Sequence, residues 1–372
     1  MAGFAGKIAA VLLLLAQGAP EKDPSFFPIG VWLQDTRNAA AYKAAGINVY
    51  VALWRGPTNE QLDALKAAGL KAICRQNSAG LARKDDPTIL AWMHGDEPDN
   101  AQPNQGGGYG PPIPPEKIVE DYKRLKAADP SRPVLLNLGQ GVAWDDYVGR
   151  GVRRNHPEDY PEYLKGCDIA SFDIYPVVHD KPEVAGKLWF VPQGVERLRK
   201  GSNDEKPVWN CIEASRIDNP TLKATVSQIR SEVWMSLIHG SRGLIYFVHQ
   251  FKPTFIEASL LRDVELLKGV TEINRQVREL APVLNSPTVR DGATATSSSA
   301  DAPVAAMVKR HGGAAYLFAV GMREQAVKGS FALKDVKAGT AEVLGEGRTI
   351  PVRDGAFVDD FKPYEAHLYM IK

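Results

Sequence analysis

The stretch "NVYVALWRGPTNEQLDALKAAGLKAICRQ", residues 48–76, decides the fold class of this protein. It begins and ends with a short apolar run of strand length, NVYVALW (48–54) and KAICRQ (71–76). The segment between them has the apolar spacing of an amphipathic helix, and Thr58 stands where a helix N-cap is expected. A strand, a helix and a second strand in this order are typical of a parallel sheet covered by helices.

The same alternation of apolar runs and helical patterns continues along the chain on both sides of this stretch. No Gly-rich dinucleotide or phosphate fingerprint follows the first apolar run, which disfavours an open doubly wound sheet. Eight strand-helix units in about 260 residues favour instead a (β/α)8 barrel spanning residues 20–284. The expected strands lie within residues 26–34, 48–54, 71–76, 89–98, 132–139, 168–177, 207–215 and 243–251.

From residue 285 onward the helical spacing stops, and short alternating segments follow one another. The run AAMVKRHGGAAYLFAVGM (305–322) has a Gly-Gly pair at its centre, which indicates a hairpin. We therefore expect residues 285–372 to form a separate antiparallel β-sandwich domain.

The N-terminus has the layout of a secretory signal peptide. Lys7 precedes an apolar core of about nine residues, and small residues follow it at Ala16, Gly18 and Ala19. The core is too short to cross a bilayer. The sequence therefore predicts a signal peptide over residues 1–19 and a secreted or periplasmic protein without a membrane anchor; the alternative interpretation is an apolar N-terminal helix.

The charge balance bears on the partners of the protein, and the cysteines bear on disulfides. The chain has 45 Lys and Arg residues against 44 Asp and Glu residues, a net charge of +1, which gives no sign of a nucleic-acid or membrane partner. The three cysteines, Cys74, Cys167 and Cys211, form no close-spaced pair and lie in or beside predicted strands. We expect buried apolar thiols and no disulfide.

Two glutamates stand at matching positions of the predicted barrel. Active sites of such barrels lie at the C-terminal ends of the strands, and only the fourth and seventh strands end in a glutamate, Glu97 and Glu213. Two carboxyl groups across a barrel mouth suit glycoside hydrolysis, in which one protonates the leaving oxygen and the other attacks or stabilises the sugar carbon. The alternative interpretation is that each glutamate only ends its strand and pairs with an arginine.

Other polar and aromatic residues near strand ends are candidates for binding a sugar. Trp and Tyr rings stack on the apolar faces of sugars, and polar side chains bind their hydroxyl groups. No His-x-His pair occurs at the first strand and no His-Glu-x-x-His helix occurs, so we expect neither a metal nor another cofactor. The candidate substrate-binding residues are Asp96, Trp32, Trp54, Asn137, Asp173, Tyr175, His249 and Gln250.

On these residues the sequence resembles clan A of the glycoside hydrolases. The clan's strand-four signature is commonly Asn-Glu-Pro, and here it stands as Asp96-Glu97-Pro98, so it departs at its first position. The resemblance implies that Glu97 is the acid/base, that Glu213 is the nucleophile, and that Tyr175 lies beside the nucleophile. Barrel-plus-sandwich β-glucanases are one candidate group within the clan.

The resemblance implies an exported enzyme that cleaves a β-linked glycan or oligosaccharide with retention, by a double displacement through two glutamates. Two alternatives stay open. One is an inverting glycosidase, and the other is a barrel that binds carbohydrate without turnover.

Overall fold

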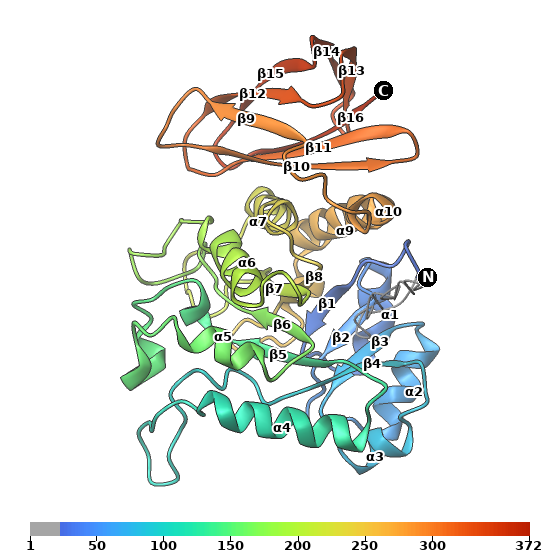
Figure 1. The fold of residues 1–372 in the computed structure, drawn as a ribbon. Helices are drawn as coiled ribbons and strands as arrows, with labels where there is room; N and C mark the ends of the chain where they lie inside the picture. The colour runs from blue at the N-terminus through green and yellow to red at the C-terminus, as the bar shows by residue number, and fades with distance from the viewer. Residues whose placement is uncertain (1–22) are drawn as a thin grey trace, which may run out of the picture.

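The computed structural model describes residues 23–372, so the predicted signal peptide at residues 1–19 lies outside the described residues. Eight parallel strands close into a barrel in chain order, each paired with its sequence neighbours and β1 with β8 (Figure 1). The predicted (β/α)8 barrel is thereby confirmed. The strands are β1 (Ile29–Trp32), β2 (Val49–Val51), β3 (Lys71–Cys74), β4 (Ile89–Met93), β5 (Val134–Leu138), β6 (Ile169–Phe172), β7 (Val208–Glu213) and β8 (Gly243–Phe247).

Helices follow the strands and surround the barrel. The predicted N-cap Thr58 is confirmed. Its side chain accepts a hydrogen bond from the Gln61 backbone N–H, and the Thr58 backbone N–H donates to the Gln61 side-chain oxygen. Within residues 23–372, no helix has both the length and the apolar composition needed to cross a membrane. The helices are α1 (Ala39–Ala44), α2 (Asn59–Ala67), α3 (Ser78–Ala82), α4 (Pro115–Ala128), α5 (Asp159–Leu164), α6 (Phe190–Gly201), α7 (Val226–Ile238), α8 (Ser259–Arg262), α9 (Val264–Glu279) and α10 (Ala281–Leu284).

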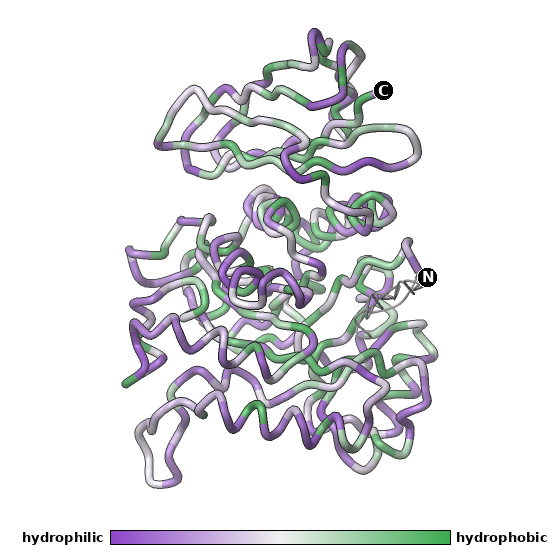
Figure 2. The backbone as a smooth tube through the Cα atoms, in the orientation of Figure 1, coloured by the Kyte–Doolittle hydropathy of each residue, from purple (hydrophilic) through white to green (hydrophobic). Residues whose placement is uncertain are grey.

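The apolar residues of each barrel strand alternate between two buried layers, and the strands are mostly hydrophobic along their length (Figure 2). On β7, Trp209 and Cys211 face the inside of the barrel, while Val208 and Ile212 pack against the surrounding helices. This two-sided burial explains why the strand sequences read as continuous apolar runs. The three cysteines are buried and free, as predicted.

The C-terminal domain is an eight-stranded antiparallel sheet in the order β10-β11-β16-β13-β14-β15-β12-β9. The predicted Gly-Gly hairpin joins β10 and β11, and both glycines adopt the positive φ angles that such a turn requires. The sheet curls until β9 approaches β10 and encloses its own apolar core. The strands are β9 (Ala293–Ser297), β10 (Val304–His311), β11 (Ala314–Gly321), β12 (Val327–Leu333), β13 (Ala338–Val343), β14 (Arg348–Arg353), β15 (Ala356–Phe361) and β16 (Ala366–Ile371).

This domain packs against α7 and α10 on one side of the barrel, and it also reaches the loop after β6, where the Tyr364 hydroxyl donates to the Gly186 carbonyl at 2.9 Å (Figure 1). The rings of Trp234 on α7 and Phe318 on β11 lie 5.4 Å apart. The Ser231 hydroxyl donates to the Tyr364 carbonyl at 2.6 Å, and the Arg230 guanidinium donates to the Ala366 carbonyl at 2.7 Å. An apolar contact supported by hydrogen bonds of buried polar groups indicates a fixed arrangement of the two domains.

Candidate active site

The C-terminal ends of the barrel strands carry an unusual number of strained backbone positions. Leu33 after β1, Ala52 after β2, Glu97 after β4 and Ile217 after β7 have φ angles of 49°, 64°, 43° and 50°. Residues other than glycine rarely adopt positive φ, and β-branched residues such as Ile217 do so least of all. Such strain gathers at functional sites, so it marks this end of the barrel as the candidate site.

Two carboxyl groups from β4 and β6 meet at this mouth. Glu97 follows β4 and Asp173 follows β6, and their side chains are hydrogen-bonded to each other. Both residues continue the inward-facing positions of their strands, since Met93 and Ile169 face the inside of the barrel. Two carboxyl oxygens in contact require a shared proton. We call Glu97 and Asp173 the mouth pair.

The surroundings of the mouth pair favour the protonated form. Burial, followed by the charges of Asp96 and Asp99, raises the pKa of Glu97 to about 7. Burial, followed by the charge of Glu97, also raises the pKa of Asp173 well above its ordinary value. One proton therefore stays on the pair near neutral pH, which is the state that a general acid needs.

Asp96 lies beside the pair and is held by the polar layer of the barrel. Its carboxylate accepts a hydrogen bond from the Asn137 side-chain amide at 2.9 Å, and the Asn137 oxygen accepts one from the Ser171 hydroxyl at 2.7 Å. The Arg75 guanidinium is near enough for its charge to act on Asp96. The structure thus brings the predicted residues Asp96, Asn137 and Asp173 together with Glu97.

Tyr175 lies on the same wall of the mouth. Its hydroxyl is buried next to the Cys211 thiol and has no nitrogen or oxygen partner among residues 23–372. The charges of Asp173 and Glu97 both act on it. A buried hydroxyl whose partner is a thiol, a weak hydrogen-bond acceptor, can exchange that contact for a ligand.

An aromatic wall leads from Tyr175 to the rim of the barrel. The ring of Tyr175 lies 5.1 Å from that of Phe247, which lies 5.2 Å from that of His249. Phe251 and Phe255 stack on His249, and their exposed fractions are 43% and 62%. The sequence analysis missed the three phenylalanines. Their spacing in YFVHQFKPTF (246–255) was the available signal, but a buried strand has the same composition.

His249 and Gln250 differ in their placement. The His249 Nε2 lies 3.2 Å from the Gln34 Nε2, and the Tyr42 hydroxyl donates to the Gln34 oxygen at 2.5 Å, so the imidazole is fixed from below. Burial lowers the pKa of His249, which keeps it neutral. Gln250 instead donates to the Thr254 carbonyl at 3.3 Å within the loop after β8.

The two tryptophans predicted to stack on a sugar differ in their exposure. Trp32 is 5% exposed and belongs to the apolar interior of the barrel. Trp54, in the loop after β2, is 65% exposed, and the Arg55 guanidinium lies 5.8 Å from the centre of its ring. Of the two, only Trp54 offers an open face to a sugar.

Glu213 has a different environment from Glu97. It is fully buried, and its two carboxylate oxygens accept hydrogen bonds from the backbone N–H groups of Val177 and Val178, at 2.6 and 3.0 Å. Its side chain also contacts Glu232 of α7. We call Glu213 and Glu232 the inner pair. Glu97 contacts Asp173, whereas the carboxylate of Glu213 accepts hydrogen bonds from the loop after β6; the catalytic pairing of Glu97 with Glu213 across the mouth stays a prediction.

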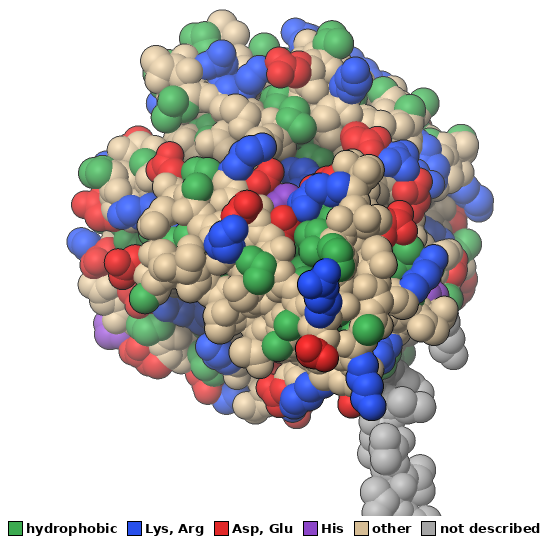
Figure 3. Space-filling model, turned by 90° about the horizontal axis from the view of Figure 1, so that it is seen from above, with side chains coloured by type: hydrophobic (Ala, Val, Ile, Leu, Met, Phe, Trp, Pro, Cys, Tyr) green, Lys and Arg blue, Asp and Glu red, His purple; other side chains and the backbone are tan. Residues whose placement is uncertain are grey.

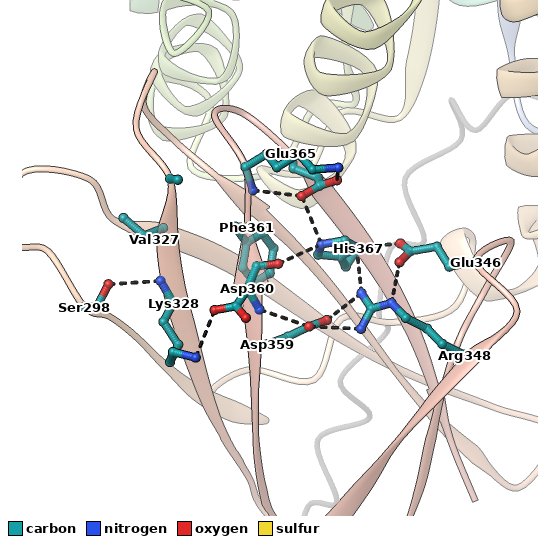
Figure 4. Close-up of a pocket in the computed structure, with 12 residues that line it drawn as sticks. Ser298, Val327, Lys328, Glu346, Arg348, Asp359, Asp360, Phe361, Glu365 and His367 are labelled. Carbon is teal, nitrogen blue, oxygen red and sulfur yellow. Dashed lines mark hydrogen bonds and ion pairs between the residues drawn. The ribbon is translucent and has the colours of Figure 1, made fainter.

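A pocket of about 630 Å³ lies in the C-terminal domain (Figure 4). Its charged side chains are paired with each other: Arg348 binds both oxygens of Asp359 at 2.9 and 2.8 Å and also contacts Glu346. His367, 4% exposed, lies between Glu346 and Glu365. The pocket is therefore a salt-bridge network without an unpaired group that would select a ligand.

Seen from above, acidic and basic side chains are interspersed over the molecule (Figure 3).

Among the described residues, no group of three or more His, Cys, Asp or Glu side chains is placed to hold a metal ion. The mouth is thus defined by its carboxyl groups, its aromatic wall and the neutral His249.

Comparison with solved structures shows the fold of this chain in several proteins of known structure. An α-amylase from Geobacillus thermoleovorans in complex with acarbose matches with a TM-score of 0.55 at 12% identity, over 95% of this chain and 99% of that one. AmyP in complex with maltose matches with a TM-score of 0.55 at 9% identity, over 93% and 96%.

A third structure, described as an α-galactosidase from Bacteroides fragilis, matches with a TM-score of 0.56 at 10% identity, over 94% of this chain and 79% of that one. At these identities the likeness shows the fold. Neither a protein-family model nor a curated protein matches the sequence.

Proposed function

We propose that this protein is a glycoside hydrolase in which Glu97 protonates the glycosidic oxygen. The observation that carries the proposal is the hydrogen-bonded mouth pair, Glu97 with Asp173, at the C-terminal ends of β4 and β6. Solved structures with the same fold support it: one is an α-amylase in complex with acarbose, one is described as an α-galactosidase, and AmyP is in complex with maltose.

The chemistry follows from the shared proton. Glu97 transfers its proton to the glycosidic oxygen, the bond from that oxygen to the anomeric carbon breaks, and the leaving alcohol departs. Water supplies a hydroxyl group to the anomeric carbon, and the second proton of that water returns to Glu97. The pKa of Glu97, about 7, suits both steps near neutral pH.

Asp173 is the carboxyl group proposed to act opposite Glu97. In the substrate-free protein the two groups touch, whereas retaining enzymes hold their carboxyl groups about 5 to 5.5 Å apart and inverting enzymes about 6.5 to 9.5 Å apart. The bound sugar must therefore enter between the two side chains and open the pair. Retention, expected from the resemblance to clan A, stays a prediction, and so does the β-linkage.

The aromatic wall supports a carbohydrate as the substrate. Phe251, Phe255 and Trp54 expose apolar faces at the rim, Asp96 is exposed as well, and the Tyr175 hydroxyl and Asn137 lie further in. Apolar faces combined with a few inward polar groups match the surface of a sugar ring.

The test is a screen of the purified protein against 4-nitrophenyl glycosides of both anomeric configurations and a set of neutral polysaccharides. Turnover of one substrate, lost in Glu97→Gln, is the expected result. Calorimetric binding of a glycan without any turnover would instead favour the carbohydrate-binding barrel. For the active substrate, the anomer released first, read by NMR, distinguishes retention from inversion.

A further inference from the structure

Glu213 and Glu232 are buried where the end of β7 meets α7. Both residues are 0% exposed, Glu213 at the end of β7 and Glu232 in the middle of α7. A buried carboxyl group is costly unless other groups compensate it, so the contacts of the two side chains define what each can do.

Glu213 is tied to the loop that follows β6. Its two oxygens each accept one backbone N–H, from Val177 and from Val178. Val177 comes four residues after Asp173 and two after Tyr175. Fixing these two amides therefore fixes the segment that carries Asp173 and Tyr175 into the mouth.

A second contact holds the same loop from the opposite direction. The side-chain amide of Asn219, in the loop after β7, donates to the Val178 carbonyl at 3.1 Å. Both peptide groups next to Val178 are thus bonded to the region around the end of β7. This gives the loop a fixed path without contributing a group to the mouth.

Glu232 supplies the third partner of Glu213. Its carboxyl contacts that of Glu213, and the backbone N–H of Glu213 acts on it as well. Two N–H donors favour the ionised form of Glu213, whereas burial and the Glu213 charge outweigh the single backbone N–H that favours the ionised form of Glu232. Burial also raises the pKa of Glu232 well above its ordinary value. The proton of the inner pair therefore stays on Glu232, which donates it as a hydrogen bond to Glu213.

We propose that Glu213 is a positioning residue, whose ionised carboxylate, held by the protonated Glu232, clamps the Val177 and Val178 amides and thereby places Asp173 and Tyr175 in the mouth. This inference rests on the proposed function, because it concerns the same site. It assigns Glu213 a role different from the nucleophile that the resemblance to clan A implies. Two backbone N–H groups and the Glu232 carboxyl contact this carboxylate and fix its orientation toward the loop after β6.

The experiment uses chemical rescue on the 4-nitrophenyl glycoside that the protein hydrolyses fastest. Azide replaces a missing carboxylate nucleophile and forms a glycosyl azide, but it cannot restore the path of a loop. Glu213→Ala is expected to lose about 100-fold in kcat/KM, the size that a misplacement of reacting groups produces. Azide should leave that loss unchanged. Formation of a glycosyl azide by Glu213→Ala would overturn the proposal and restore Glu213 as the nucleophile.

Two conservative variants sharpen the test. Glu232→Gln keeps a donor toward Glu213, so its kcat/KM should stay within about threefold of the unaltered protein. Asn219→Ala removes the second tie of the loop without touching Glu213, and it covers the case in which Glu213→Ala fails to fold. Amide hydrogen exchange at Val177 and Val178 should rise at least about tenfold in Asn219→Ala and stay unchanged in Glu232→Gln.

Exchange at Val177 and Val178 that stays unchanged in Glu213→Ala, or a loss above about 100-fold in Glu232→Gln, contradicts the clamp. Failure of the proposed function has a separate signature. Full activity of Glu97→Gln, or no hydrolysis of any glycoside by the unaltered protein, would remove the enzyme itself. The hydrogen exchange at Val177 and Val178 would still report on the clamp.

Discussion

The mouth pair and the inner pair have the same chemistry and opposite surroundings. Glu97 and Asp173 meet where the barrel opens to solvent, next to the Tyr175 hydroxyl and an exposed aromatic rim. Glu213 and Glu232 meet where every neighbour is protein, and backbone amides use the oxygens of Glu213. A shared proton can be given to a ligand only in the first case; in the second it holds two elements together.

The largest expected effect is the loss of activity when either residue of the mouth pair is replaced. Glu97→Gln and Asp173→Asn should each lower kcat/KM at least about 1,000-fold, equivalent to about 4 kcal/mol of transition-state stabilisation, because each removes a group that touches the reacting atoms. The melting temperature should stay nearly unchanged, since the amide replaces a carboxyl group that already shares one proton with its partner. The matched control is Glu116→Gln in the exposed first turn of α4. Residual activity above about one tenth in either mouth variant would break the comparison.

The second effect is on stability and its dependence on pH. The pKa of Glu213 is raised from 4.5 to about 7 and that of Glu232 is also raised, so between these pH values the folded protein holds more protons than the unfolded chain. The free energy of unfolding should therefore fall as pH rises through this window. Glu232→Gln should raise the free energy of unfolding at pH 8 by on the order of 2 to 3 kcal/mol and should reduce its dependence on pH. Urea unfolding at pH 5 and pH 8 measures both.

In the same experiment, Glu116→Gln should leave the slope as it is. An unchanged slope in Glu232→Gln would show that the inner pair does not hold the proton that its contacts imply.

The third effect tests the aromatic wall. Phe255→Ala removes the most exposed ring of the stack on His249 and should raise KM about fivefold to tenfold with kcat nearly unchanged, since stacking of this kind contributes about 1 kcal/mol to binding. Val264→Ala, another exposed apolar residue in the chain segment that follows, is the control. An equal response of both variants in steady-state kinetics would mean that the rim does not contact the substrate.

The smallest effect concerns Asp96, where the sequence departs from the clan A signature. Its charge is one of the two that raise the pKa of Glu97, so Asp96→Asn should move the alkaline limb of the kcat/KM profile from near pH 7 downward by about half a unit to one unit. The limb reports the loss of the proton from the general acid. A shift to higher pH, or none, would show that Asp96 is not a charged neighbour of Glu97.

The sequence predicted the positions of the eight strands and of the Gly-Gly hairpin, because apolar runs, helix caps and turn residues are local signals. It also predicted that Glu97, Asp96, Asn137, Asp173 and Tyr175 belong to one mouth, since the ends of parallel strands in a barrel face the same side. The sequence did not predict that Glu97 contacts Asp173. Position at a strand end favoured Glu213 as its partner, because the direction of a side chain beyond the end of its strand cannot be derived from the strand pattern.

The sequence by itself thus determined the barrel, the appended sheet and the side of the barrel on which the acids gather, because periodicity and strand order decide these. Only the tertiary structure decided which acids touch. The loop after β6 brings the Val177 and Val178 amides over Glu213, and α7 brings Glu232 against it, so three residues distant along the chain contact the carboxylate. Asp173, free of such partners, is left to meet Glu97. Hydrogen bonds between groups far apart in the sequence decide which acids are in contact, and no local sequence pattern predicts such bonds.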